Sequence, residues 1–123
     1  AGAIKSSSNS TGVGYTAGAG GNVTQLTSKS TGVTLNTVAG SITMAATALA
    51  SNATANFTMT NSNIATTDII LLNLRSGGTA MTYAVMVDSI AAGSCVIAVR
   101  NYSLTSRSEA IIINFAIIKS SIN

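Results

Sequence analysis

The chain has 123 residues, of which 46% are apolar and only 7% are charged, so it is long enough for one domain with a hydrophobic core. Histidine, tryptophan and proline are absent and there is one cysteine, which excludes Cys–His or His–Asp catalysis, histidine-based metal sites and an intramolecular disulfide. The net charge of +3 comes from basic residues spread along the whole sequence, without a basic patch or interleaved aromatic residues. We therefore predict no nucleic-acid partner, and either a structural protein or a binding module.

Membrane and export signals are not visible. The sequence has no charged-then-apolar leader, and its longest mostly apolar stretch, residues 110–118, is interrupted by Asn114 and is too short to span a bilayer. We expect a protein made in a cytoplasm, or the mature part of a longer one, without a membrane partner.

Residues 1–22 differ in composition from the rest and hold six of the eleven glycines, together with a run of serines. Such chain has no apolar periodicity and cannot form a core of its own. Two interpretations stay open. The segment is either a disordered tail or an extended N-terminal arm that packs on a neighbouring molecule, with Ile4, Val13 and Tyr15 as its anchors.

From residue 23 to residue 123 the pattern is short apolar runs broken by small polar residues, which is typical of an all-β domain. Alternation predicts strands in residues 31–36 and 41–44, and most clearly in 54–60, where the odd positions are apolar and the even ones are Thr and Asn. The alanine-rich residues 44–50 are too short for a stable isolated helix and are interpreted as a loop.

The second half of the domain is more apolar. Two segments, residues 68–74 and 109–119, are predicted to be strands with two apolar faces. Two more strands are predicted in residues 81–88 and 94–100, joined by a tight connection at Gly93, a natural site for a positive φ. The Gly77-Gly78 pair predicts a hairpin turn. About seven strands at this spacing predict a single β-sandwich, immunoglobulin-like or jelly-roll-like.

The lack of charge has a consequence for association. Sheet edges recruit other strands unless charge, proline or bulges protect them, and this sequence offers no proline and few charges. We predict that the edges and the second face of the last strand, with Ile112 and Ile118, are covered in an oligomer or larger shell. The alternative is a sandwich covered by its own loops.

Few residues could carry chemistry. Asp68, Asp88 and Glu109 could supply a carboxylate pair for glycoside hydrolysis, but each stands at an ordinary turn or strand-end position. No loop has calcium-binding spacing, and the glycine-rich segments lack the Lys-Ser/Thr of a phosphate loop. Five aromatic residues without tryptophan make a poor sugar-binding platform. We predict no enzyme activity, no cofactor and no metal.

One segment carries a resemblance. Residues 20–36 read GGNVTQLTSKSTGVTLN, which resembles the GGxVTQxTSKSTxVTLN opening of small virion proteins of tailed bacteriophages and prophages. The likeness continues to residue 119, through residues 40–44, 57–62, 91–95, 99–101 and 108–119. It departs in loops: Asn52 stands where relatives often have glycine, and residues 104–106 replace a more glycine-rich loop.

The resemblance implies a virion structural protein, a decoration or cement protein on the capsid exterior or a head fibre, assembled in the host bacterial cytoplasm. It implies a β-sandwich that associates as a homotrimer at a capsid symmetry axis, with its arm touching the major capsid protein. The alternative is a fibre or tail component whose loops around residues 77–78 and 101–108 bind a host glycan or protein receptor.

Overall fold

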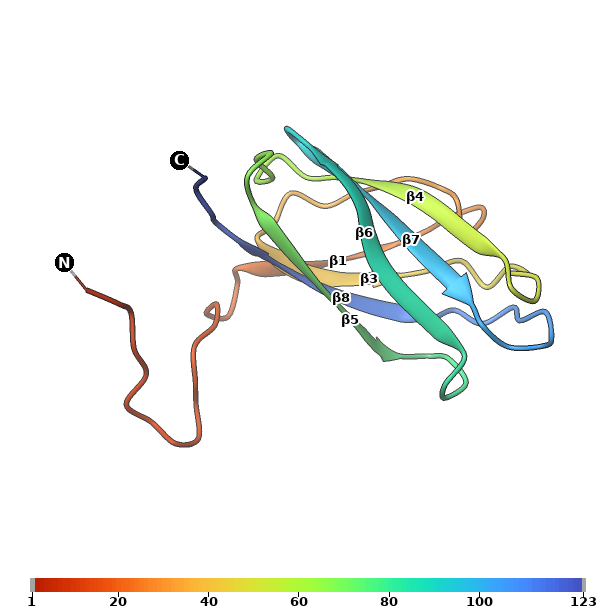
Figure 1. Cartoon of the computed structure of the whole chain (residues 1–123), viewed down its shortest axis with the longest axis horizontal. Helices are drawn as coiled ribbons and strands as arrows, with labels where there is room; N and C mark the ends of the chain where they lie inside the picture. The colour runs from red at the N-terminus through yellow and green to blue at the C-terminus, as the bar shows by residue number, and fades with distance from the viewer. Residues whose placement is uncertain (1, 123) are drawn as a thin grey trace.

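The computed structural model describes residues 2–122, which form eight β-strands and no helix (Figure 1). In chain order these are β1 (Gly20–Thr24), β2 (Val33–Thr34), β3 (Ala39–Thr43), β4 (Thr54–Thr60), β5 (Ile69–Ser76), β6 (Tyr83–Ala91), β7 (Ser94–Asn101) and β8 (Ile112–Ile118). Within these residues no helix could cross a membrane.

The strands form two four-stranded sheets that pack face to face. Sheet A has the order β1-β3-β8-β5 and sheet B the order β2-β4-β7-β6. Both sheets are mixed, because β1 pairs with β3 and β2 with β4 in parallel, whereas the other neighbours are antiparallel. The predicted all-β sandwich is therefore confirmed, with eight strands instead of seven.

The core lies between the sheets and follows the period of two along each strand. On β4 the buried positions alternate with exposed Thr and Asn, as the sequence predicts. The largest fully buried side chains include Ile97 from sheet B and Ile113 from sheet A. Cys95 is also buried, and burial raises the pKa of its thiol to about 11, so it packs as a small apolar residue.

Two connections were predicted correctly and one was not. Gly93 has a φ of +80° in the tight connection between β6 and β7, and residues 44–50 form a loop with one bridge, between Leu49 and Arg107. The hairpin at Gly77-Gly78 was wrong, because β5 and β6 belong to different sheets. Gly77 is still required, since its φ is +84° and a Cβ there would meet the Ala110 carbonyl oxygen at 2.4 Å.

The first strand was not predicted as a strand, and the arm is shorter than residues 1–22. β1 begins at Gly20 and lies along β3, with Gly21 opposite Gly40. A Cβ on Gly40 would lie 2.6 Å from the Gly21 carbonyl oxygen, so this pair of glycines permits the close approach of the two strands.

Asn52, which stands where the resembling virion proteins often have glycine, has a φ of +56°. Glycine adopts this left-handed region freely and asparagine tolerates it, so the replacement is compatible with the same loop conformation.

The prediction of unprotected edges was wrong for the two long edge strands. β5 and β6 each contain a bulge, and the extra residue is charged in both: Arg75 opposite β8 and Asp88 opposite β7. Charged bulges are a common protection against edge-to-edge pairing. The other edges are short, because β1 has five residues and β2 has two. The edges of the sheets are therefore protected, and exposed apolar side chains are to be found on an outer face of the sandwich.

Candidate interaction surface

An apolar patch lies on the outer face of sheet A, where β5 and β8 are neighbours. Ile69 pairs with Ile118 and Leu71 with Ala116, and we call these four residues the β5–β8 patch. Ile69 is 50% exposed, Leu71 53% and Ile118 44%. The patch exists because both strands are apolar at every position of this end, so the pleat directs one set inward and the other to the surface.

The N-terminal arm approaches this patch. Val13, Gly14 and Tyr15 line a hollow of about 310 Å³ together with Leu71, Ala116 and Ile118, three members of the patch. The Tyr15 hydroxyl donates a hydrogen bond to the main-chain carbonyl of Ile117. Beyond this anchor the arm extends away from the sandwich, at the end where the C-terminus also leaves (Figure 1). Residues 2–12, if fully extended, reach roughly 35 Å, which is enough to contact a neighbouring molecule.

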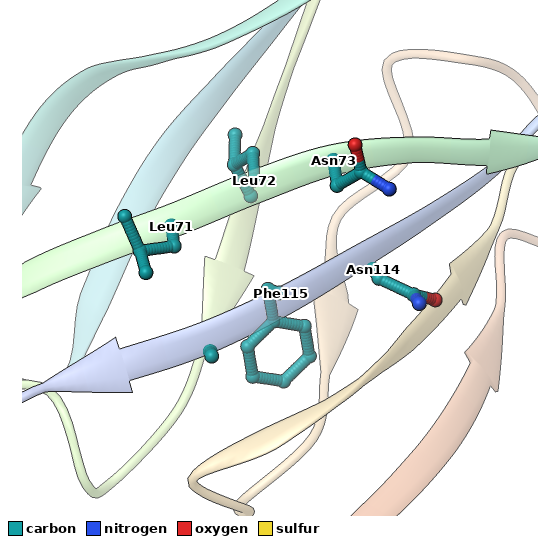
Figure 2. A pocket seen from close by; sticks show the side chains of 6 residues that line it. Leu71, Leu72, Asn73, Asn114 and Phe115 are labelled. Atoms are coloured by element: carbon teal, nitrogen blue, oxygen red, sulfur yellow. The ribbon is translucent and has the colours of Figure 1, made fainter. Parts of the chain in front are cut away.

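A polar, uncharged row borders the patch. Asn22, Ser41, Asn114 and Asn73 are in register across all four strands of sheet A. The Ser41 hydroxyl donates to Asn114 Oδ1 at 2.9 Å. Asn73 and Asn114 lie with Leu71 and Phe115 around a second hollow, of about 270 Å³, between patch and row (Figure 2). Amide side chains present donors and acceptors without the desolvation cost of a charge, which suits contact with another protein.

The structure brings only some of the predicted contact residues together. Val13, Tyr15 and Ile118 meet at the β5–β8 patch. Ile112 is half-buried and pairs with Thr43 and Ser76, on the far side of the polar row from Ile118. Ile4 is exposed, in the part of the arm beyond the Tyr15 anchor.

Sequence reasoning missed three residues of the patch: Ile69, Leu71 and Ala116. The signal was available, because residues 68–74 were interpreted as a strand with two apolar faces. A strand in which Ile70 and Leu72 face the core must present Ile69 and Leu71 on its other side.

The motif that carries the resemblance has a structural role in this fold. Gln25 and Lys29 are buried, although both are polar. The Gln25 amide donates to the carbonyls of Lys29 and Thr31 at 3.1 and 2.9 Å, and its oxygen accepts from the Ala45 N–H at 3.1 Å. The Lys29 ammonium donates to the carbonyls of Ala45 and Glu109, both at 2.6 Å, and burial lowers its pKa. These bonds fasten the loop after β1 to the loops at the same end of the sandwich.

Two of the three carboxylates hold loops in place. Asp68 forms an ion pair with Lys119 at 2.7 Å, and the hydrogen bond from Lys119 lowers the pKa of this carboxyl. Glu109 accepts hydrogen bonds from Thr79 and from the Tyr83 hydroxyl, the latter at 2.6 Å, and these lower its pKa to about 2. Burial and the same bond raise the pKa of Tyr83. Within residues 2–122 no cluster of three metal-ligating side chains occurs.

Comparison of the chain with protein-family models, with curated proteins and with solved structures found no match.

Proposed function

We propose that this chain is a structural protein of a bacteriophage virion, which decorates or cements the exterior of the capsid. In this proposal it forms a homo-oligomer, a trimer, and contacts the major capsid protein through its arm and the outer face of sheet A. It is not an enzyme and needs no cofactor.

The observation that carries the proposal is the half-exposed β5–β8 patch beside an arm that leaves the domain. The four residues of the patch carry no charge, so another protein can cover them without burying an unpaired ion. The charged group beside the polar row is the Arg75 guanidinium, which donates to the Ser41 hydroxyl at 3.5 Å. Few charges also keep repulsion small between closely packed copies. The resemblance of residues 20–119 to phage virion proteins supplies the setting.

The experiment is a binding assay on capsids. Purified protein is added to tailless heads from which this protein has been genetically removed, and bound copies are counted after the heads are sedimented. We expect saturable binding. Deletion of residues 1–17, which ends before β1, and the substitution Leu71→Asp are each expected to weaken binding about tenfold or more, because both remove part of the proposed contact.

The matched control is Thr58→Asp, which places the same charge at an exposed position on the outer face of sheet B. It should bind like the wild type. Failure of the wild-type protein to bind, or equal binding by Leu71→Asp and Thr58→Asp, would contradict the proposal.

A second candidate is a fibre or tail component that binds a host receptor through its loops. Met81 is 99% exposed, with a φ of +58°, and Leu104 is 90% exposed in the loop between β7 and β8. The two loops are joined by a hydrogen bond from Arg107 to the Thr79 hydroxyl, at 3.2 Å. Loss of host-cell adsorption in a Met81→Ser, Leu104→Ser double variant that still binds heads would favour this role.

A further inference from the structure

A third surface hollow, of about 230 Å³, lies on the outer face of sheet B, on the other side of the sandwich from the β5–β8 patch. Its floor is Ala98 on β7, whose neighbours across the sheet are Asn56 on β4 and Met86 on β6. The hollow exists because a methyl group stands between two longer side chains that face the same way.

Arg100 forms one wall. Its guanidinium carbon lies 5.0 Å from the centre of the Tyr102 ring, a cation–π contact that orients the group. Its Nε is shielded from solvent and has no hydrogen-bond partner within residues 2–122. Because Nε is shielded, the donors that Arg100 offers to the hollow are those of its two terminal amino groups.

Asp88 lines the same hollow from the bulge of β6. Asp88 and Arg100 have opposite charges, but within residues 2–122 the ion pair between Lys119 and Asp68 is the only one with a separation of 4.0 Å or less. The hollow therefore combines a carboxylate acceptor and a guanidinium donor that do not neutralise each other by direct contact.

From this combination we infer that the outer face of sheet B binds a neutral saccharide. Sugar hydroxyls can donate to Asp88 and accept from Arg100, while the apolar C–H faces of a sugar ring pack on Met86 and on Tyr102, which is 53% exposed. Asp88 and Arg100 carry opposite charges, so the hollow has no net charge that would favour an anion or a cation over a neutral ligand. The sequence predicts a poor sugar-binding platform because it has only five aromatic residues. That prediction did not include the position of Tyr102 beside a hollow.

This inference goes beyond attachment to a capsid and does not depend on it. If the outer face of sheet A docks on a shell, the outer face of sheet B points away from it, toward the surroundings of the particle. Attachment uses one face and saccharide binding uses the other, so the two can be tested separately.

The test is a titration of the isolated, isotope-labelled full chain, followed by its amide NMR spectrum. The neutral probes are maltotriose, galactose and N,N′,N″-triacetylchitotriose, each up to about 50 mM, which detects a Kd of about 1 mM. Sialic acid and spermine serve as charged comparators. We expect saturable shifts of the Asn56, Ala98 and Tyr102 amides with at least one neutral probe, and none there with the comparators.

Three variants locate the site. Ala98→Leu fills the hollow, Asp88→Asn removes its acceptor charge and Arg100→Lys removes its planar donor group; each should weaken binding about tenfold or more while the spectrum stays dispersed. The control is Arg75→Lys, the same change at the bulge residue of the other sheet, which should bind like the wild type. Absence of shifts with all three neutral probes, stronger binding of a charged comparator, or unchanged binding by Ala98→Leu would overturn the inference.

Discussion

The two outer faces of this sandwich both carry Asn and hydroxyl side chains, but they differ in what else they leave exposed. The face of sheet A has an apolar end at Ile69, Leu71 and Ile118 and an uncharged row of Asn and Ser beside it. The face of sheet B has Thr and Asn along β4, separated charges at Asp88 and Arg100, and the half-exposed Met86. A face with a contiguous apolar patch favours contact with protein, whereas a face on which one apolar side chain stands among hydroxyls, amides and charges favours a polar ligand.

The largest expected effect separates the two sides of sheet A. Ile113→Ala in the core should lower the free energy of unfolding by about 2–5 kcal/mol, because it leaves a cavity between the sheets. Leu71→Ala, on the outer side of the same sheet, should cost less than about 1 kcal/mol, since Leu71 is already half in contact with water. Urea denaturation of both variants measures the difference. Equal losses would mean that the β5–β8 patch belongs to the core and is not free for a partner.

A smaller effect is expected at the edges. Asp88→Thr removes the charged bulge residue of β6 and raises the net charge from +3 to +4. A higher net charge alone would slow aggregation. We nevertheless expect Asp88→Thr to aggregate several-fold faster than the wild type in a thioflavin assay, because an unprotected edge strand recruits other strands. Arg75→Thr should act similarly on β5.

The control for Arg75→Thr is Lys5→Thr, which makes the same change of net charge in the exposed arm. If Lys5→Thr aggregates as fast as Arg75→Thr, the effect belongs to net charge and the bulges do not protect the edges.

The smallest expected effect concerns Glu109. Hydrogen bonds from Thr79 and Tyr83 lower its pKa to about 2, below its ordinary value of 4.5. A carboxyl whose pKa is lower in the folded state stabilises the fold above the unfolded pKa, and this contribution is lost as the pH falls from about 4.5 to about 2. The difference in urea midpoint between the wild type and Glu109→Gln should therefore shrink between about pH 6 and about pH 2.5. A difference that stays constant with pH would contradict the assignment.

The sequence predicts those parts of the fold in which a short stretch of residues is compatible with only one local structure. The alternation of residues 54–60 and the small turn at Gly93 are local, and both are confirmed. The pairing of strands is not local. The same two glycines, Gly77 and Gly78, fit a hairpin or a crossing between sheets, and the choice depends on which strands are neighbours.

The missed elements have related causes. β1 was not predicted because its Gly-Gly-Asn start has no alternation, and its position depends on the close approach of Gly21 to Gly40. The bulges at Arg75 and Asp88 depend on register, which one sequence does not reveal. The burial of Gln25 and Lys29 was not predicted either, because it depends on main-chain groups from distant parts of the chain, at Ala45 and Glu109, that form hydrogen bonds with them.

The central claim is that the chain forms a trimer that contacts the capsid through the β5–β8 patch, and sedimentation equilibrium of the full chain at micromolar concentration tests the trimer most directly. We predict a species of about three times the 12.3 kDa chain mass, and Leu71→Asp and Thr58→Asp should both leave it unchanged because neither residue is assigned to the contact between copies. A wild-type protein that stays at 12.3 kDa throughout this concentration range would contradict the oligomer on which the account is built.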